Sequence, residues 1–388
     1  MTEGEPDTVT GGTQRNRQVV VMPDSFGGTL DAVEAAAAIG AGWHAARPHD
    51  TVTLAPQSDG GPGFVDVLAT AFGGEVRTQT VTGPLGAPVR ASWLLHDAVA
   101  YLETAQACGL SRLPGPPDPA GARAATTAGV GDLLSAALLA GCRRIVVGLG
   151  GSATSDGGRG AAERLGGLAA ARRLLAGVDL VVATDVDNPL LGRDGAAAVF
   201  APQKGADAVV VAALEKRLTG WADELERVCG RAVRDLPGAG AAGGLGAFLL
   251  ACDGRRESGA HVVATRTHRP AVIAGADLVI TGEGRLDAQT RHGKLVAAVA
   301  AEATAAGVPV LVLVGQSALT PAEEAEFGDV HTLVHHAGSP AAALAEAGPQ
   351  LTSLTEALAR DRPETWWSGG PGESAAEVGE RGGGTLGE

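Results

Sequence analysis

Short apolar runs alternate along the chain with longer Ala-rich stretches whose hydrophobic positions recur at helical spacing. The apolar runs are bounded by Gly, Pro or Asp, which is typical of buried strands. They predict strands over 18–22, 99–103, 144–148, 180–185, 278–281 and 310–314, and the stretches between them predict helices over 30–46, 63–72, 127–140, 208–228 and 294–306. Continuous apolar strands separated by helices indicate parallel sheet covered on both faces. We therefore expect an α/β protein.

Length and local composition divide the chain further. Its 388 residues favour two domains over one. Residues 1–17 are polar, and residues 361–388 are rich in Gly, Pro, Glu and Ser, so we expect both ends to be disordered. Helix and strand signals fill the sequence between them.

Charge and cysteine content exclude several classes of function. The formal net charge is −14, and no run of Lys or Arg is present, which argues against nucleic acid and against an anionic membrane as partners. No apolar run is long enough to span a bilayer, and the N-terminus lacks a signal-peptide pattern. The four cysteines are scattered and form no CxxC motif, so we interpret them as reduced thiols in a cytoplasmic protein.

Polar residues and glycines follow the predicted strands at their carboxyl ends. The segments concerned are Asp24-Ser25, Asp59-Gly60-Gly61, Asp185-Val186-Asp187-Asn188 and Glu283-Gly284-Arg285-Leu286-Asp287. Ligands of open α/β sheets bind beyond the carboxyl ends of the strands. We expect these segments to converge on one cleft. Each aspartate taken alone could instead cap a helix or close a turn.

The segment from Gly148 to Gly160 reads GLGGSATSDGGRG and follows a predicted strand. Its small side chains and backbone N–H groups allow close approach to an oxyanion, and a following helix would add its positive dipole end. Only three lysines occur in the chain, and two of them, Lys204 and Lys294, lie beside glycines. Such positions suit a compact cation near a phosphate.

Other common motifs fit less well. Gly148, Gly150 and Ala153 satisfy a dinucleotide fingerprint, but Asp156-Gly157-Gly158 interrupts the expected helix start. No acidic residue follows a second strand at the spacing that ribose binding needs. A P-loop would need glycine at Ala288, and there is no GxSxG elbow or set of metal-binding histidines. Carboxylates, glycine loops and sparse positive charge favour phosphoryl transfer, with carboxylates holding Mg²⁺ and one orienting the attacking hydroxyl.

At these residues the chain resembles the bacterial glycerate kinase family of the first type, from about Val19 to about Gly338. The resemblance rests on many short motifs in the same order, namely Pro23-Asp-Ser-Phe26, Ser58-Asp-Gly-Gly61, Glu103-Thr-Ala-Gln-Ala-Cys-Gly-Leu110, Ala125-Thr-Thr-Ala-Gly-Val-Gly131, Gly150-Gly-Ser-Ala-Thr-Ser-Asp-Gly-Gly158, Asp185-Val-Asp-Asn-Pro-Leu190, Phe200-Ala-Pro-Gln-Lys-Gly-Ala206, Gly238-Ala-Gly-Ala-Ala-Gly-Gly244 and Thr281-Gly-Glu-Gly-Arg-Leu-Asp287 continuing to Lys294.

The resemblance implies a fold, an activity and a division of roles. Residues 18–80 and 268–360 would form a discontinuous Rossmann-like domain, residues 81–267 an inserted α/β domain, and the active site would lie in the cleft between them. The activity would be phosphorylation of D-glycerate to 2-phosphoglycerate, with ATP and Mg²⁺ as cofactors and the hydroxy-acid as partner. Catalysis would fall to Asp185, Asp187, Glu283 and Asp287, with Asp185 and Glu283 as metal ligands. The substrate would bind Asp24, Ser25, Asp59, Gly60, Gly61, Asn188, Arg285 and Gln289. The nucleotide phosphates would bind Gly150, Gly151, Ser152, Thr154, Asp156, Lys204 and Lys294.

The chain departs from the family at several loop positions. Gly27 stands where relatives usually carry Lys, and Pro62 stands where they carry Glu. Ser58, Phe64 and Ser155 replace Ala, Thr and Asn. Three alternatives stay open at this point: a kinase of a related hydroxy-acid, a metabolite-binding paralogue without turnover, and a dinucleotide-dependent oxidoreductase. Whether the protein forms a homodimer is also open.

Overall fold

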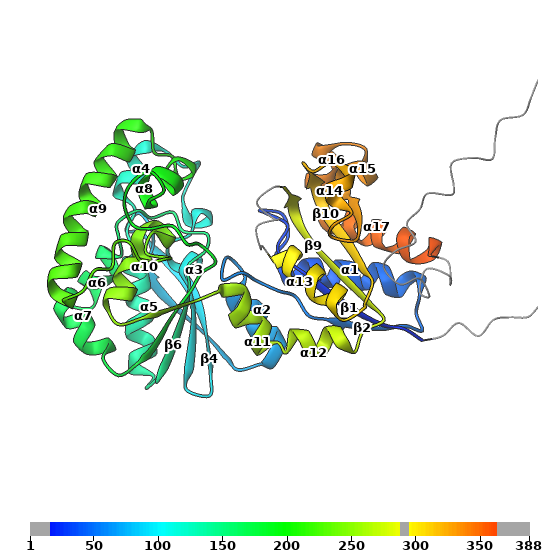
Figure 1. Ribbon diagram of the computed structural model, residues 1–388, viewed down its shortest axis with the longest axis horizontal. Helices are drawn as coiled ribbons and strands as arrows, with labels where there is room; N and C mark the ends of the chain where they lie inside the picture. The colour runs from blue at the N-terminus through cyan, green and yellow to red at the C-terminus, as the bar shows by residue number, and fades with distance from the viewer. Residues whose placement is uncertain (1–15, 288–294, 363–388) are drawn as a thin grey trace, which may run out of the picture.

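The computed structural model describes residues 16–287 and 295–362, which build two β-sheets flanked by helices (Figure 1). One sheet has five strands and the other has six. Parallel strands with helical crossovers make up the whole of the first sheet and four of the six strands of the second. The prediction of an α/β fold with Rossmann-like parallel sheet is confirmed.

The five-stranded sheet has the strand order β11-β10-β9-β1-β2, and every pairing is parallel. Its strands are β1 (Gln18–Pro23), β2 (Thr51–Leu54), β9 (Leu278–Leu286), β10 (Val310–Ser317) and β11 (Asp329–Thr332). The central strands are apolar along most of their length, because helices cover both faces. All carboxyl ends of this sheet therefore lie at one edge.

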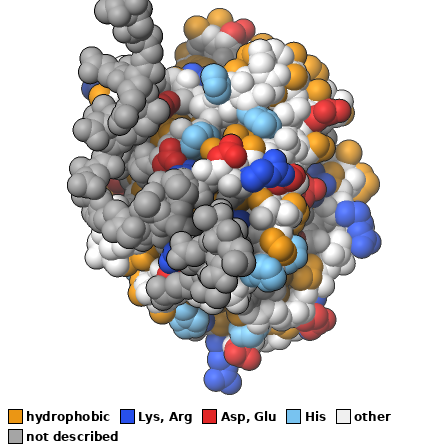
Figure 2. Space-filling model, turned by 90° about the vertical axis from the view of Figure 1, so that its right-hand side faces the viewer, with side chains coloured by type: hydrophobic (Ala, Val, Ile, Leu, Met, Phe, Trp, Pro, Cys, Tyr) orange, Lys and Arg blue, Asp and Glu red, His pale blue; other side chains and the backbone are white. Residues whose placement is uncertain are grey.

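Helices from both ends of the chain cover the five-stranded sheet. One face carries α1 (Ala32–Ala46), α15 (Leu333–Ala337), α16 (Pro340–Ala345) and α17 (Ala347–Asp361); the other carries α12 (Arg269–Ala274), α13 (Leu295–Ala305) and α14 (Pro321–Glu324). Helix α1 begins at an Asp31–Glu34 capping box and buries Ile39 and Trp43 against α17. Figure 2 views the end of the molecule that carries α17, where acidic and basic side chains are interspersed with apolar ones.

The six-stranded sheet has the order β3-β4-β5-β6-β7-β8. Its strands are β3 (Glu75–Thr82), β4 (Pro88–His96), β5 (Val99–Glu103), β6 (Arg144–Gly148), β7 (Asp179–Ala183) and β8 (Arg255–Glu257). Strands β5 to β8 are parallel, whereas β3, β4 and β5 pair antiparallel. Strands β3 and β4 were missed because polar and apolar residues mix along them, as is usual for a sheet edge that faces water.

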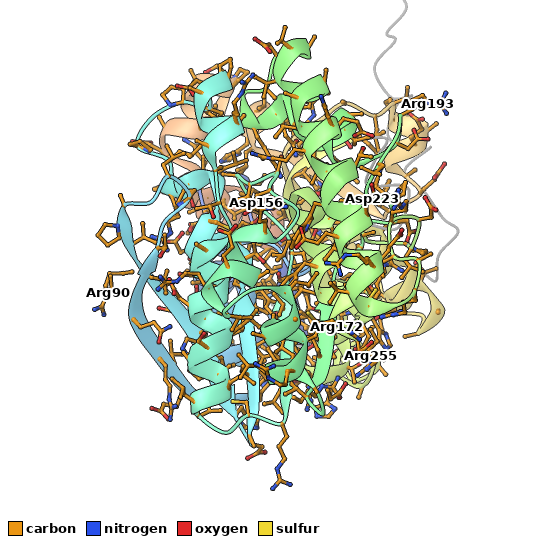
Figure 3. All side chains as sticks on the ribbon, turned by 90° about the vertical axis from the view of Figure 1, so that its left-hand side faces the viewer. Arg90, Asp156, Arg172, Arg193, Asp223 and Arg255 are labelled. Carbon is orange, nitrogen blue, oxygen red and sulfur yellow. The ribbon has the colours of Figure 1, made fainter. Side chains whose placement is uncertain are left out.

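The helices around this sheet fall into two groups. One face is covered by α5 (Ala128–Leu139), α6 (Arg159–Arg164), α7 (Leu168–Leu175), α8 (Ala196–Phe200), α9 (Ala208–Cys229) and α10 (Ala241–Ala251), with the short α3 (Thr104–Cys108), η1 (Leu110–Arg112), α4 (Pro119–Ala124) and η2 (Pro202–Lys204) in the connecting loops. The other face is covered by α2 (Phe64–Phe72) and α11 (Gly259–Arg266). Figure 3 looks onto the first of these faces.

The chain passes from one sheet to the other earlier than the resemblance implied. Strand β3 begins at Glu75 and belongs to the six-stranded sheet, and α2 packs against that sheet through Phe64 and Leu68. The passage therefore lies within residues 55–63, and the boundary expected at residue 80 falls inside β3. The return passage follows β8 through α11 and α12, on either side of the boundary expected at 267.

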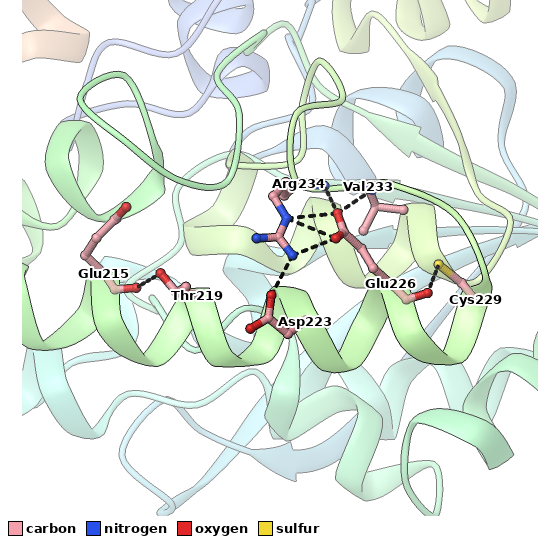
Figure 4. Close-up of polar contacts among 7 residues, drawn as sticks. All are labelled: Glu215, Thr219, Asp223, Glu226, Cys229, Val233 and Arg234. Atoms are coloured by element: carbon pink, nitrogen blue, oxygen red, sulfur yellow. Dashed lines mark hydrogen bonds and ion pairs between the residues drawn. The ribbon is translucent and has the colours of Figure 1, made fainter.

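An ion-pair cluster fixes the turn after α9 (Figure 4). Arg234 contacts Glu226 through Nε at 3.0 Å and Nη2 at 2.6 Å, and Asp223 through Nη2 at 2.7 Å. These bonds from Arg234, with the backbone N–H groups of Val233 and Arg234, hold the pKa of Glu226 at about 2. The cluster lies on the outside of the helical layer and is structural.

Among the described residues, no helix is long and apolar enough to cross a membrane.

Candidate active site

The loop after β2 joins the two sheets. Gln57 still bonds to the backbone of β1, through its N–H to Pro23 O at 2.9 Å, but the residues that follow lie against the second sheet. Gly60 O accepts the N–H of Gly150 at 3.1 Å, at the end of β6. A Cβ added to Gly150 would lie 2.3 Å from Gly61 Cα, so glycine is required where the two loops meet.

The same loop also contacts the start of α11. A Cβ on Gly259 would lie 1.9 Å from the backbone oxygen of Asp59, and a Cβ on Gly60 would lie 3.1 Å from Ala183 O at the end of β7. Segments at the ends of β2, β6 and β7 therefore pack directly on one another. The predicted convergence of strand ends is present at these contacts.

Three carboxylates lie close together, from the residue after β1, the loop after β2 and the second half of β9. Asp24 is half-buried, Asp59 is exposed and Glu283 is 9% exposed. Burial, followed by the nearby carboxylate of Asp59 and more weakly that of Glu283, raises the pKa of Asp24 well above its ordinary value. The N–H of Ser25 opposes this shift by donating to Asp24 Oδ1 at 2.6 Å. Asp24 therefore keeps its proton to a higher pH than an ordinary aspartate does.

Asp185 lies across the loop from this group. It is exposed at the end of β7, and its Oδ2 accepts the N–H of Ala260 at 3.1 Å, at the start of α11. Since Asp59 also contacts the start of α11 through Gly259, Asp185 and Asp59 flank the same helix end. That end of α11 contributes a positive partial charge between them.

Asp187 and Asn188, which follow Asp185 in the sequence, bond to other parts of the protein. Asp187 forms an ion pair with Arg256 at 2.7 Å, and the side-chain amide of Asn188 donates to the backbone oxygen of Asp194 at 2.7 Å. Both side chains thus have protein partners in this structure. Their assignments to catalysis and to substrate binding stay predictions.

The Gly148–Gly160 loop uses many of its own N–H groups within the protein. Leu149 donates to Ala183 O at 3.1 Å, Ala153 to Cys108 O at 2.8 Å and Gly157 to Gly243 O at 3.0 Å. The glycine-rich sequence predicts a loop whose N–H groups are free. The structure instead shows a loop whose shape is set by bonds to four other segments, so that only part of its backbone could face a phosphate.

Asp156 explains much of that shape. Its carboxylate accepts the N–H and hydroxyl of Thr127, at 2.8 and 2.9 Å, and the N–H groups of Gly158 and Gly160, at 3.1 and 3.0 Å. The side chain is 8% exposed and lies inward among the helices, whereas Arg90 and Arg193 project from the rim (Figure 3). Asp156 holds the starts of α5 and α6 together. Its assignment to nucleotide binding stays a prediction.

Lys204 is also buried, at 3% exposed. Its Nζ donates to Thr154 O at 2.6 Å and to Ser152 Oγ at 3.1 Å. Burial lowers the pKa of Lys204 to about 8, despite the opposing effects of Cys108 and Asp156. The ammonium group therefore supports the glycine loop from inside. Binding of the nucleotide by Lys204, Ser152, Thr154, Gly150 and Gly151 stays a prediction.

The remaining candidates lie at the end of β9 and in the segment after it. Arg285 is exposed and pairs with Asp287 at 3.5 Å. Gln289 and Lys294 lie outside the described residues, so their assignments stay predictions as well.

The carboxylates fit a magnesium ion that is shared with a substrate. The described residues contain no group of three or more His, Cys, Asp or Glu side chains arranged to hold a metal. Mg²⁺ in phosphate-binding sites is commonly held by one or two carboxylates together with phosphate oxygens. The crowding of Asp24, Asp59 and Glu283, which raises the pKa of Asp24, would be relieved by a bound cation. Asp185 and Glu283 remain the predicted ligands.

Two residues that matter were not assigned roles from the sequence. Glu103, at the end of β5, is 2% exposed and accepts the N–H groups of Gly63 and Val65 at 3.1 and 3.3 Å. Burial raises the pKa of Glu103 to about 7. Arg112 lines a cavity of about 280 Å³ together with Ser25. In the sequence, Glu103 stands at the end of a predicted strand, as the other carboxylates do, and this position could have marked it. No feature of the sequence marks Arg112.

Comparisons with known proteins match this arrangement. The family model described as the glycerate kinase family matches residues 19–362. An uncharacterized protein of Mycobacterium bovis is 54% identical over 346 residues, which cover 88% of this chain and 91% of that protein. Glycerate 2-kinase of Escherichia coli K12 is 37% identical over 326 residues, covering 77% and 85%. A crystal structure from Salmonella typhimurium LT2, designated glycerate kinase 2, has a TM-score of 0.69 at 34% identity and covers 89% of this chain and 98% of that one. The chain therefore belongs to the glycerate kinase family of phosphotransferases.

Proposed function

We propose that the protein transfers the γ-phosphoryl group of ATP to D-glycerate, with Mg²⁺, and that the product is 2-phosphoglycerate. The observation that carries the proposal is the packing of the loop after β2 against β6, β7 and α11. This packing puts the loop of Asp59, whose carboxylate acts on Asp24, against the start of α11, where Asp185 accepts the N–H of Ala260. The Escherichia coli relative is named for phosphorylation at the 2-position, which supports the same product here.

Asp24 is the residue best suited to take the proton of the attacking hydroxyl. A general base works best when its pKa lies near the working pH, and burial, the largest cause, raises the pKa of Asp24 above that of an ordinary aspartate. The N–H of Ser25 holds Asp24 Oδ1 at 2.6 Å and so orients the carboxyl group. The deprotonated carboxylate would accept the hydroxyl proton as the oxygen attacks the phosphorus.

The other side chains would position and neutralise charge. Mg²⁺, when bound, would neutralise charge on the transferring phosphates. Asp185 and Glu283 would hold it, and the loop that Lys204 supports would shape the nucleotide side. The start of α11, to which Asp185 is bonded, would add its dipole to the same site. Phosphoryl transfer needs mainly positioning and charge stabilisation, so these residues suffice for it.

The oxidoreductase alternative loses its support. The glycines of its fingerprint admit the backbone of Gly60 and Gly61 rather than a dinucleotide, and the family is one of phosphotransferases. A paralogue without turnover stays a distinct outcome of the experiment below.

The experiment combines purified protein with ATP, Mg²⁺ and a panel of hydroxy-acids, measuring ADP release and locating the phosphate in the product by NMR. We expect D-glycerate to be the preferred acceptor. Asp24→Asn should lower kcat by about 100- to 10,000-fold, the usual worth of a general base, with little change in KM for ATP. Asp223→Asn, on the outside of α9 (Figure 4), serves as the matched control and should be unchanged.

Two results would contradict the proposal. No ADP release with any acid would show a binding protein without turnover. Normal turnover in Asp24→Asn would remove the base assignment and leave the remaining carboxylates to be tested.

A further inference from the structure

A small cavity opens where the loop after β1 meets the segment after β5. Ser25, Gly27 and Gly28 line it from one side, and Gln106, Ser111 and Arg112 line it from the other. Its volume is about 280 Å³, below the range of about 300–1,000 Å³ that is usual for sites of drug-sized ligands. The size suits a small metabolite of a few carbons.

Arg112 brings a positive charge to this cavity, where the carboxyl group of Glu103 interacts with it electrostatically. Its Nη2 donates to Gln106 Oε1 at 3.0 Å, and its Nε is buried without a hydrogen-bond partner. Within residues 16–287 and 295–362, no ion pair includes Arg112. The buried guanidinium groups of Arg47 and Arg269, by contrast, pair with Asp50 and Glu302 at 2.8 and 2.5 Å. A guanidinium group that forms no ion pair and lies beside a cavity is suited to binding an anionic ligand.

Gln106 adds a second donor beside the guanidinium. Its Oε1 accepts both Arg112 Nη2 at 3.0 Å and the N–H of Ser92 at 3.4 Å, which fixes the orientation of the amide. Its NH₂ group has no acceptor among the residues that the structure describes. Two donors side by side match the two oxygens of a carboxylate.

The charges around the cavity select for a ligand with one negative charge. Four carboxyl groups also line it, those of Asp31, Glu34, Asp66 and Glu103. The first two are used in the capping box of α1, and Glu103 accepts two N–H groups of α2. A polyphosphate would meet these four groups with Arg112 as the one cation among the described residues that line the cavity. A monocarboxylate needs only that cation.

We propose that Arg112, with Gln106 beside it, binds the carboxylate of the hydroxy-acid substrate and so selects acids over uncharged polyols. The inference rests on the proposed function. Ser25 lines the cavity and directly follows Asp24, so a three-carbon acid held at Arg112 extends its hydroxyl end toward Asp24. The cavity thereby connects the site of binding with the site of reaction.

The test measures binding and turnover separately. Calorimetry gives Kd for D-glycerate, and steady-state ADP release gives kcat and KM for D-glycerate and for its uncharged analogue glyceramide. Arg112→Gln should raise Kd and KM for D-glycerate about 10- to 100-fold, the usual cost of losing a charged hydrogen bond, while KM for ATP stays the same. Its preference for D-glycerate over glyceramide should fall by a similar factor. Arg112→Lys, which keeps the charge but not the paired donors, should recover part of it.

Arg90→Gln is the matched control, because Arg90 is an exposed arginine on β4 at the rim of the molecule (Figure 3). Thermal unfolding of each variant shows whether it is folded. Unchanged Kd and KM for D-glycerate in folded Arg112→Gln would overturn the inference and leave the kinase assignment standing. Arg112-dependent binding of D-glycerate without turnover in the wild type would support the inference and overturn the kinase assignment. A wild type that neither binds nor phosphorylates D-glycerate would overturn both.

Discussion

Glu103 carries a buried carboxyl group whose proton is coupled to folding. Its pKa is raised from 4.5 to about 7, chiefly by burial, although two N–H groups of α2 bond to it. Between these two pH values the folded protein keeps a proton that the unfolded chain has lost. The free energy of unfolding therefore decreases as pH rises through this window. Above the window, the folded protein bears the full cost of burying the ionised carboxylate.

We expect Glu103→Gln to remove this pH dependence. A glutamine oxygen can still accept the N–H groups of Gly63 and Val65, and it does not ionise. Urea unfolding at pH 5 and pH 8 should show a larger decrease for the wild type than for the variant, by up to about 3 kcal/mol. Glu75→Gln, at an exposed position on β3, serves as the control. Equal decreases in wild type and Glu103→Gln would show that the carboxyl group is ionised throughout.

At the scale of elements, helix starts and loops carry the polar residues that the sequence singled out. Asp156 accepts four hydrogen bonds from the starts of α5 and α6 and the turn between β6 and α6. The possibility that a single aspartate caps a helix or closes a turn thus describes much of what Asp156 does. Its contribution to phosphate binding would be indirect, through the shape of the loop.

Asp156→Asn tests that distinction. One carboxylate oxygen would become an NH₂ group facing N–H donors, so we expect the free energy of unfolding to fall by about 2–4 kcal/mol. The measurement is urea unfolding, with ADP release measured on the same samples. Asp223→Asn again provides the control on an exposed helix surface. A variant as stable as the wild type but without turnover would instead indicate direct contact with the nucleotide or metal.

The reliability of the element predictions followed the way each element is buried. Strands β1, β5 and β6 are buried along nearly their whole length, so a continuous apolar run marked them. Strands β3 and β4 face water on part of their surface, and their mixed pattern was missed. Local pattern indicates an element well only when one environment surrounds it.

At the scale of the whole molecule, glycines let the loop between the two sheets pack closely against the second sheet. Gly259 at the start of α11 leaves no room for a side chain, because its Cβ would lie 1.9 Å from Asp59 O. That backbone belongs to the loop that carries Asp59 to the second sheet. The relation between the carboxylates of the two sheets therefore depends on a position with no chemistry of its own.

Gly259→Ala should push this loop away from α11. We expect a loss of about 1–3 kcal/mol in stability and a decrease in kcat that exceeds the change expected from stability alone. Gly220→Ala is the matched control, since a Cβ there meets nothing within 4 Å and Gly220 is exposed in α9. The control should gain about 0.5–1 kcal/mol and keep its activity. Normal turnover in Gly259→Ala would show that the loop position does not control the site.

The order of apolar runs, the glycine loops and the residue types at strand ends were sufficient to indicate the α/β class, the phosphoryl-transfer chemistry and the family. These features are local, because each depends on a few neighbouring residues and on whether the segment is buried. Tertiary structure decided which polar groups are already bonded within the protein and which lie close to one another. Asp156 and Lys204 are taken up by bonds within the protein, Asp24 acquires a raised pKa from burial and then from Asp59 and Glu283, and Arg112 forms no ion pair with a described residue. Burial and hydrogen bonding of these groups depend on segments far apart in the sequence, which no local pattern specifies.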